Sequence, residues 1–518
     1  MKKYILFSSI FIAAVLSAPA QVFELVKEIN TAGNSYPSSF TSANNKLFFI
    51  ATDNVNYNKL WVTEGTAATT QFIGPAGSVI GSISNLVSYN NKLFFSCNDG
   101  INGQELWVSD GTIGGTQMFK DVYPGANGSY PQYFTVANNK LFFMGSSPAG
   151  ERRLYVSDGT AAGTFVVKNN YIDILNGQST FMVLNNAVYF RSDNGSGAGN
   201  GLWKSDGTLA GTVIVKPDLI AGTLGANYAV LNNKLYFSGF DYTNGSELWV
   251  TDGTDPGTYM VINLSTDGVG ILNSGAPQAL TVYNSKIYFS AKDDTHGQEL
   301  FVTDGTAAGT QLVKDILPGI SSSFPSEITV YNGLLYIFSY PLSELWKSDG
   351  TDAGTQKVKT ILPYARFAAV WNGKIYMVSG SDATIWESDG TATGTKPAVV
   401  SNTNNPISYS GADLAFTGYN GAIYFSGFSP FITSGYELCR LVTGLPPVTS
   451  FTFTGSGNWS NPANWSWGLV PPANLPSGNH IVITGTCILD VTQNVQSGAS
   501  ITVATGGTLL ILGSLNTF

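Results

Sequence analysis

A motif that recurs along most of the chain limits its fold more than any other feature. A full copy is ELWVTDGTDPGT at Glu247 to Thr258, and close copies begin at Glu105, Glu299 and Glu344. The acid of each Asp-Gly-Thr or Glu-Gly-Thr triplet is Glu64, Asp110, Asp158, Asp206, Asp252, Asp304, Asp349 or Asp389. This spacing of about 40 to 52 residues is typical of the four-stranded blades of a β-propeller.

Each repeat contains four short β-prone runs separated by turns. Residues 132–169 show them as QYFTV, KLFFMG, RLYVSD and FVVK, with Asn138-Asn139 between the first two. Asn-Asn and Asn-Gly pairs tolerate the positive φ angles of tight hairpins, and Asp-Gly-Thr begins the next reversal. The strands carry large apolar residues on both faces, as expected of sheets that pack face to face around an axis.

We expect the tryptophan of each repeat to pack between neighbouring blades. These positions are Trp61, Trp107, Trp203, Trp249, Trp346 and Trp386. The triplet acids are interpreted as turn residues, because one copy per blade spreads them around a ring and they cannot converge on one substrate. The glutamates Glu105, Glu247, Glu299 and Glu344 are expected to begin a strand and to bond a neighbouring blade.

The two ends of the repeat region predict how the ring closes. The hairpin pair of strands occurs about nine times, and the last unit ends near Gly444 without a fourth strand. FELVKEI, from Phe23 to Ile29, resembles TQLVKDI, from Thr310 to Ile316. We therefore predict an all-β propeller of about eight or nine blades, in which the N-terminal strand completes the last blade and removes open edges.

The N-terminus and the charge indicate an exported, acidic protein. Residues 1–20 combine two lysines, an apolar stretch and Ala18-Pro19-Ala20, which is typical of a signal peptide cleaved near Ala20. The net charge of -9 disfavours nucleic acid and anionic membranes as partners. No later stretch is apolar enough to span a bilayer, and we expect a secreted or surface-bound monomer. The three cysteines, Cys97, Cys439 and Cys487, are too few for a disulfide framework.

The pattern changes after residue 444. Residues 445–458 include Pro446-Pro447 and are expected to form a linker that follows a propeller spanning 21–444. Residues 459–518 contain brief apolar runs separated by Gly-rich turns. This last segment is similar to the opening rungs of a parallel β-solenoid from secreted bacterial adhesins, in a short or truncated copy.

The recurring motif resembles the bacterial ELWxxDGT repeat family over about residues 22–444. The resemblance implies an exported or surface-exposed repeat protein and brings no established catalytic motif. Departures from the pattern are Glu64 for Asp, Thr69-Thr70 for Gly-Thr, Tyr155 and Phe301 for Trp, and the lost motif near Cys439.

Residues suited to catalysis or metal binding are sparse. The two histidines, His296 and His480, lie far apart, so neither a zinc site nor a Ser-His-Asp triad is indicated. Adjacent Asp293 and Asp294 are interpreted as a solvated turn, although carboxylate pairs can support glycosidase or lyase chemistry. The loops 98–104, 192–201 and 292–298 could offer oxygen ligands to Ca²⁺, but none matches an EF-hand, and we expect no cofactor.

The variable loops after the second and fourth strands share the end opposite the tight turns. Recognition usually occurs in such loops, so we expect a glycan or surface-protein ligand there. Candidate contacts are Asp99, Asn102, Tyr123, Tyr130, Asp193, Asp241, Tyr242, Asp293, Asp294 and His296. Three functions fit the sequence: a binding or adhesion scaffold without catalysis, an extracellular carbohydrate-active enzyme with carboxylates at the propeller mouth, or a structural surface spacer.

Overall fold

The computed structural model describes most of residues 21–517. The gaps are 56, 75–82, 147–150, 169–180, 193–200, 222–227, 267–273, 362–365, 380–383, 399–407, 410–415, 429–434, 444–449, 462–463, 466–469, 472–473, 476–479, 496 and 498. The signal peptide expected at 1–20 and the candidate residue Asp193 lie outside the described residues.

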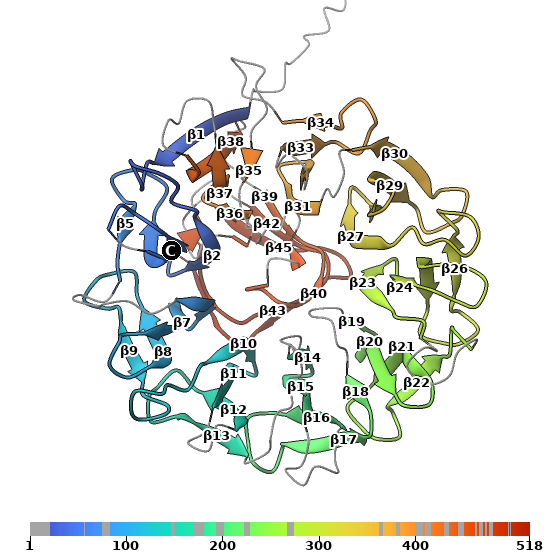
Figure 1. Ribbon diagram of the computed structural model, residues 1–518, viewed down its shortest axis with the longest axis horizontal. Coiled ribbons are helices and arrows are strands. Elements are labelled where there is room, and N and C mark those ends of the chain that lie inside the picture. Colours follow the sequence, from blue (N-terminus) through green and yellow to red (C-terminus); the bar gives the residue numbers. More distant parts are fainter. Residues whose placement is uncertain are drawn as a thin grey trace, which may run out of the picture.

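The described strands of the repeat region form nine antiparallel sheets, arranged as blades around one axis (Figure 1). In each blade the first strand lies nearest the axis and the fourth lies at the rim. This confirms the predicted all-β propeller and sets the blade number at nine.

The strands of blades 1 to 4 follow in chain order. They are β2 (Ser38–Ala43), β3 (Lys46–Ala51), β4 (Lys59–Thr63) and β5 (Gln71–Phe72); β6 (Ser84–Tyr89), β7 (Lys92–Asn98), β8 (Gln104–Ser109) and β9 (Gln117–Lys120); β10 (Gln132–Ala137), β11 (Lys140–Ser146), β12 (Arg152–Ser157) and β13 (Thr164–Lys168); β14 (Met182–Leu184), β15 (Ala187–Ser192), β16 (Gly201–Ser205) and β17 (Val213–Pro217).

Blades 5 to 8 continue the pattern, and blade 5 has one extra short strand. They are β18 (Ile220–Ala221), β19 (Tyr228–Leu231), β20 (Lys234–Asp241), β21 (Gly245–Thr251) and β22 (Tyr259–Ile262); β23 (Gln278–Tyr283), β24 (Lys286–Ala291), β25 (Glu299–Thr303) and β26 (Gln311–Lys314); β27 (Pro325–Tyr331), β28 (Leu334–Ser339), β29 (Glu344–Ser348) and β30 (Gln356–Thr360); β31 (Arg366–Trp371), β32 (Lys374–Val378), β33 (Ile385–Ser388) and β34 (Lys396–Pro397).

Blade 9 joins the two ends of the repeat region. It contains β35 (Ser408–Tyr409), β36 (Thr417–Tyr419), β37 (Ala422–Phe428), β38 (Glu437–Thr443) and, as its fourth strand, β1 (Gln21–Lys27). Strand β1 pairs antiparallel with β38, as the sequence predicted. Arg440 Nε donates to Glu24 Oε2 at 2.7 Å, and Arg440 Nη1 donates to the Gly65 carbonyl of blade 1 at 2.7 Å. Closure therefore joins blade 9 both to its own last strand and to the next blade.

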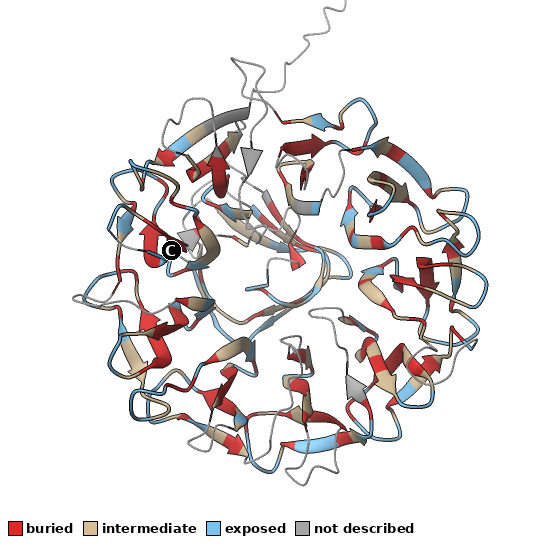
Figure 2. Ribbon diagram, in the orientation of Figure 1, coloured by how far each residue is buried: buried red, intermediate tan, exposed pale blue. Residues whose placement is uncertain are grey.

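The hydrophobic core is divided among the junctions between blades. Trp107 of blade 2 packs with Phe48 and Leu60 of blade 1 in one buried cluster. At the corresponding position of blade 9, Cys439 packs with Ile385 of blade 8. Buried residues concentrate in the second and third strands, while the outer strands and loops are more exposed (Figure 2). Because each junction buries its own cluster, replacing such a tryptophan by alanine should lower the free energy of unfolding by about 3–5 kcal/mol.

We call the end that carries the two-residue turns and the Asp-Gly-Thr turns the turn end. In blade 6, Asp304 Oδ1 accepts hydrogen bonds from the Thr306 N–H at 2.9 Å and the Thr306 hydroxyl at 2.7 Å. These donors hold the pKa of Asp304 below its usual value. Beneath the turn, the hydroxyls of Thr303 and Thr310 lie 2.7 Å apart. The same bonds recur at Asp110, Asp158, Asp206, Asp252, Asp349 and Asp389.

The second glycine of the motif follows from the position of the aspartate. A Cβ atom on Gly309 would lie 2.1 Å from Asp304 Oδ1, so no larger residue fits. Blade 1 has Glu64 and Thr69 at the two positions. There the Thr69 hydroxyl accepts the Thr66 N–H at 3.2 Å, a bond that the aspartate accepts elsewhere. The two departures from the repeat therefore compensate for each other.

Tyrosines connect neighbouring blades at the turn end. The hydroxyls of Tyr89, Tyr283 and Tyr419 donate to a carbonyl in the Asn turn of the next blade, at 2.6–2.7 Å. The last of these bonds reaches Asn45 across the closure of the ring. Both asparagines of such turns take positive φ, for example 49° at Asn90 and 55° at Asn91.

The C-terminal segment winds into three rungs. Its strands are β39 (Ser450–Phe453), β40 (Ser456–Asn458), β41 (Asn474–Leu475), β42 (His480–Ile483), β43 (Thr486–Leu489), β44 (Thr492–Val495), β45 (Ser500–Val503), β46 (Thr508–Ile511) and β47 (Ser514–Thr517). They pair in parallel as three sheets of three strands, which is the topology of a three-sided β-solenoid. Strands β39 and β40 lie inside 445–458, where we expected a linker. Trp459 and Trp465 pack in the core of the solenoid, with ring centroids 4.7 Å apart.

The described residues include no helix of the length and apolarity needed to cross a membrane. Cys97, Cys439 and Cys487 are all buried and unpaired with one another. Burial raises the pKa of the Cys97 and Cys487 thiols to about 12.

Candidate functional site at the loop end

The loop end is opposite the turn end and carries the loops after the second and fourth strands. Exposed aromatic side chains of the described propeller lie either in these loops or on the outer strands β13 and β22. The loop-end set is Tyr36, Tyr57, Tyr130, Tyr242, Phe324 and Tyr340, exposed by 45–74%. Those on outer strands are Phe165 and Tyr259. Both of these follow an Asp-Gly-Thr turn at the start of a fourth strand, so six of the eight exposed rings of the described propeller lie at the loop end and two lie near the turn end.

Three of the predicted contact residues are aspartates that organise their own loops. Asp99 and Asp293 follow the second strand of a blade and Asp241 is its last residue, and each accepts main-chain N–H bonds from residues two and three positions later. Asn102 also donates its side-chain amide to Asp99 Oδ2 at 2.7 Å. These carboxylates are therefore already engaged within their loops.

His296 takes the place of Asn102 in the third of these loops. Its Nδ1 lies 3.0 Å from both carboxylate oxygens of Asp293. That contact raises the pKa of His296. Burial favours a higher pKa for Asp293, but the bonds from His296 and Thr295 outweigh it and the pKa of Asp293 is lowered. The pair stabilises the loop without needing a ligand.

The remaining predicted contacts are spread over the loop end. Asp294 is exposed and accepts the Thr266 N–H at 2.6 Å. Tyr242 is 68% exposed and meets Phe240 edge to face at 5.3 Å. Tyr123 is half-buried, and Tyr130 is exposed. The described candidates therefore fall into two groups, one in loops of blades 2 and 3 and one in loops of blades 5 and 6, and the structure does not gather them into one cluster.

A buried glutamate fixes the loop that connects one blade to the next. The Glu105 carboxylate at the start of β8 accepts the N–H groups of Val122 and Ser129 at 2.8 and 2.7 Å, and the Ser129 hydroxyl at 2.7 Å. Both anchored residues belong to the loop between blades 2 and 3. We call this arrangement the loop clamp. It fixes two points of an irregular loop to the strand beneath it.

The clamp occurs at four junctions of the described propeller. Its glutamates are Glu105, Glu247, Glu299 and Glu437, all fully buried, and their second anchors are Ser129, Gly275, Ser323 and Ser35. Burial raises the pKa of each glutamate, against the opposing effect of the hydrogen bonds. The pKa of Glu247 reaches about 7, and its anchor Gly275 has no hydroxyl to donate.

The other blades place different residues at this position. Lys59, Arg153, Gly201 and Thr384 stand there in blades 1, 3, 4 and 8. Glu344 of blade 7 turns instead to the Trp346 indole at 3.0 Å and to Lys357 in the same blade. Of the glutamates expected to bond a neighbouring blade, Glu105, Glu247 and Glu299 hold the loop that leads to it, and Glu344 does not.

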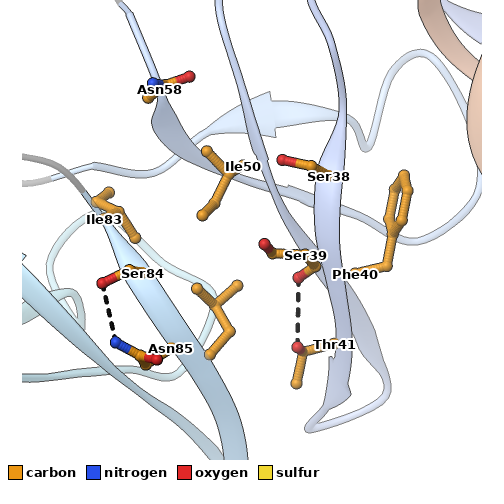
Figure 3. A pocket seen from close by; sticks show the side chains of 10 residues that line it. Ser38, Ser39, Phe40, Thr41, Ile50, Asn58, Ile83, Ser84 and Asn85 are labelled. Carbon is orange, nitrogen blue, oxygen red and sulfur yellow. Dashed lines mark hydrogen bonds between the residues drawn. The ribbon is translucent and has the colours of Figure 1, made fainter. Parts of the chain in front are cut away.

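A cavity of about 560 Å³ opens between blades 1 and 2 (Figure 3). It is lined by Ser38, Ser39, Phe40, Thr41, Ile50, Asn58, Ile83, Ser84, Asn85 and Leu86. Ser39 and Asn85 have φ of 55° and 56° at bulges in the first strands. Lys59 replaces the clamp glutamate at this junction and is buried, which lowers its pKa.

Sequence reasoning missed the second half of the clamp. The anchoring serine begins the short motifs Ser35-Tyr36-Pro37, Ser129-Tyr130-Pro131 and Ser323-Phe324-Pro325. In blades 2 and 6 this serine lies 24 residues after the clamp glutamate, and that spacing was the available signal. Glu437 was missed because the motif around it has lost its Asp-Gly-Thr. The described residues contain no group of three or more His, Cys, Asp or Glu side chains that could hold a metal ion.

No family model and no curated protein matches this chain. Among solved structures, a prolyl endopeptidase is similar at 9% identity and a TM-score of 0.37, over 68% of this chain and 54% of that one. AztD from Citrobacter koseri is similar at 14% identity and a TM-score of 0.35, over 71% of this chain and 95% of that one. Prolyl oligopeptidase B from Galerina marginata has 14% identity and a TM-score of 0.38, over 61% and 50%. The matched part thus spans about half the length of the two peptidases.

Proposed function

We propose that this protein is a secreted or cell-surface binding scaffold without catalysis, and that its loop end takes up a glycan or protein ligand. The observation that carries the proposal is the distribution of exposed aromatic rings, six of which lie in loop-end loops. Exposed rings on a rigid scaffold supply contact area with little loss of side-chain entropy on binding. We also propose that the chain is a member of the ELWxxDGT repeat proteins.

The carboxylates of the loop end do not favour the enzyme alternative. The clamp glutamates are buried and bonded to main-chain groups, and Asp99, Asp241 and Asp293 accept bonds from their own loops. A general acid or base has to reach a substrate proton within hydrogen-bond distance. We therefore expect no new reducing ends and no unsaturated products when polysaccharides are incubated with the protein.

Loop grafting tests the location of the binding site. Replacing the loops 34–36, 123–130, 241–245 and 317–324 by Gly-Ser loops of equal length that keep the anchors Ser35, Ser129 and Ser323 should abolish capture of a glycan or protein ligand. Replacing the Asp-Gly-Thr turn of blade 6 in the same way should leave capture intact, since that turn lies at the opposite end. Capture that survives the loop-end graft would exclude this face.

A further inference from the structure

The four clamped loops place one residue in the same conformation. Tyr36, Tyr130, Ala276 and Phe324 directly follow the second clamp anchor, and their φ angles are 44°, 49°, 46° and 45°. In each case the N–H donates to the carbonyl of the residue just before the clamp glutamate, at 2.9–3.3 Å. A proline follows at each of the four positions. The backbone is therefore the same four times over.

Three of these positions hold an aromatic ring that the fold does not require. Positive φ is unfavourable for bulky side chains, and such strain persists only where the surroundings enforce it. Ala276 shows that the same backbone forms without a ring. As whole residues Tyr36, Tyr130 and Phe324 are 50%, 53% and 52% exposed, so each is accessible to a ligand.

The clamp makes each ring a preorganised contact. Two anchors fix the loop to a buried carboxylate, and the following proline limits the backbone further. Near Tyr36, the Asn34 amide donates to its hydroxyl at 2.8 Å, and Tyr436 stacks on the ring at a centroid distance of 6.1 Å. A ligand that stacks on a fixed ring loses less entropy than one that has to order a mobile loop.

The arrangement of the rings favours a sugar polymer over a protein. The three rings stand at separate junctions, between blades 9 and 1, 2 and 3, and 6 and 7, so they form no contiguous apolar patch of the kind that marks a protein interface. A sugar ring presents C–H groups on one face and hydroxyls at its edge, and its C–H face can lie flat on a single exposed aromatic ring. The chain has 34 acidic and 25 basic residues, so it repels anionic polymers at long range.

We propose that Tyr36, Tyr130 and Phe324 are three equivalent stacking sites for the sugar rings of a neutral glycan, each held by a loop clamp. This inference rests on the proposed binding function and specifies its ligand class. A polymer or a densely displayed glycan engages several sites at once, and avidity then exceeds the affinity of one site.

The experiment uses the mature chain on an array of neutral oligosaccharides and in pull-downs with neutral polysaccharides. We expect the triple variant Y36A/Y130A/F324A to lose binding at least tenfold, and each single variant to lose it a few-fold. The matched control F165A/Y259A removes two equally exposed rings from outer strands and should bind as the wild type does. Ala276→Tyr places a fourth ring on an existing clamp and should raise apparent affinity a few-fold. Thermal melting of every variant confirms that it is folded.

Two outcomes would overturn the inference. If the wild type binds a neutral glycan and the triple variant binds it equally well, the stacking sites are wrong while the binding function stands. If the wild type binds no neutral glycan, the ligand class is wrong, and capture of a protein ligand by the wild type but not by the Gly-Ser loop graft would locate that ligand at the loop end.

Discussion

At the turn end of the propeller, the same hydrogen bonds repeat from blade to blade, whereas at the loop end a shared clamp holds four of the junctions in the described structure. The turn-end aspartates are mostly exposed and bond their own turns. The clamp glutamates are fully buried and bond loops that lead to another blade. The turn end therefore repeats hydrogen bonds between residues that are close in the sequence. The loop end uses contacts between residues that are distant in the sequence, at four of the described junctions.

This difference indicates which positions of the repeat tolerate sequence variation. A turn closed by neighbouring residues needs only its own few side chains, and blades 2 to 8 all keep it. A clamp needs a glutamate together with a serine or glycine that is distant in the sequence. In blade 7, Glu344 bonds within its own blade instead.

The largest expected effect comes from removing a clamp. Glu105→Ala leaves the half-buried Val122 N–H and the Ser129 hydroxyl without their acceptor, and leaves the Ser129 N–H only its bond to the Gln104 carbonyl at 3.0 Å. Because each unpaired buried donor costs about 1–3 kcal/mol, we expect an unfolding free energy lower by about 4 kcal/mol. Glu344→Ala is the control and should cost under about 1 kcal/mol. Equal losses in denaturant titrations of the two variants would mean that the clamp adds no stability.

The second effect is a pH dependence that belongs to the loop end. The pKa of Glu247 is about 7 in the fold against 4.5 in a model peptide, so folding takes up a proton in this window. Its contribution to stability is present below pH 4.5 and is lost as pH rises through 7. We expect the unfolding free energy of Glu247→Gln to rise relative to that of the wild type between pH 4.5 and 8, by on the order of 3 kcal/mol in denaturant titrations.

The turn end should respond to pH in the opposite sense. The pKa of Asp304 is lowered, so its contribution is present above pH 3.8 and is lost as pH falls further. The unfolding free energy of Asp304→Asn should therefore differ from that of the wild type by a constant amount above pH 5. If the difference in unfolding free energy between Asp304→Asn and the wild type grows between pH 5 and 8, the lowered pKa of Asp304 is contradicted.

The third effect tests the compensation seen in blade 1. Gly309→Thr in blade 6 forces a Cβ atom against the Asp304 carboxylate and should cost about 2 kcal/mol. Adding Asp304→Glu reproduces the Glu64 and Thr69 pair and should recover at least half of that loss. The coupling in a double-mutant cycle measures this directly. Losses that simply add would show that the blade 1 turn depends on other residues.

The smallest expected effect is at the exposed rings. Tyr130→Ala removes a half-exposed ring from a backbone that already accepts alanine at Ala276, so stability should change by less than about 0.5 kcal/mol. Calorimetry of Tyr130→Ala beside Glu105→Ala compares the ring with the clamp that carries it. A large loss of stability in Tyr130→Ala would mean that the ring supports the loop and is not available for a ligand.

Much of the propeller was predictable because its repeats are local. The Asn-Asn turns, the four strands of each blade and the β1 closure strand follow from residues that are neighbours or that repeat at a fixed period. The clamp was only half predictable. Glu105 was recognised as a bonding residue, but its partner Ser129 comes from an irregular loop whose path no periodicity describes.

The candidate ligand residues show the same limit. Asp99, Asp241 and Asp293 were chosen as polar loop residues, and the structure shows them occupied by their own loops. Tyr130 was among the candidates, whereas Tyr36 and Phe324 were not. Their equivalence became visible only when the shared φ angles and the shared carbonyl acceptor were known.

The sequence by itself determined the blade, its turns and the strand that closes the ring, because these depend on short-range chemistry repeated with a regular period. Only the tertiary structure decided the number of blades and the junctions that carry a clamp. Blade number depends on how apolar side chains from two sheets fit at each junction, and a clamp depends on a buried carboxylate meeting main-chain donors from a distant loop.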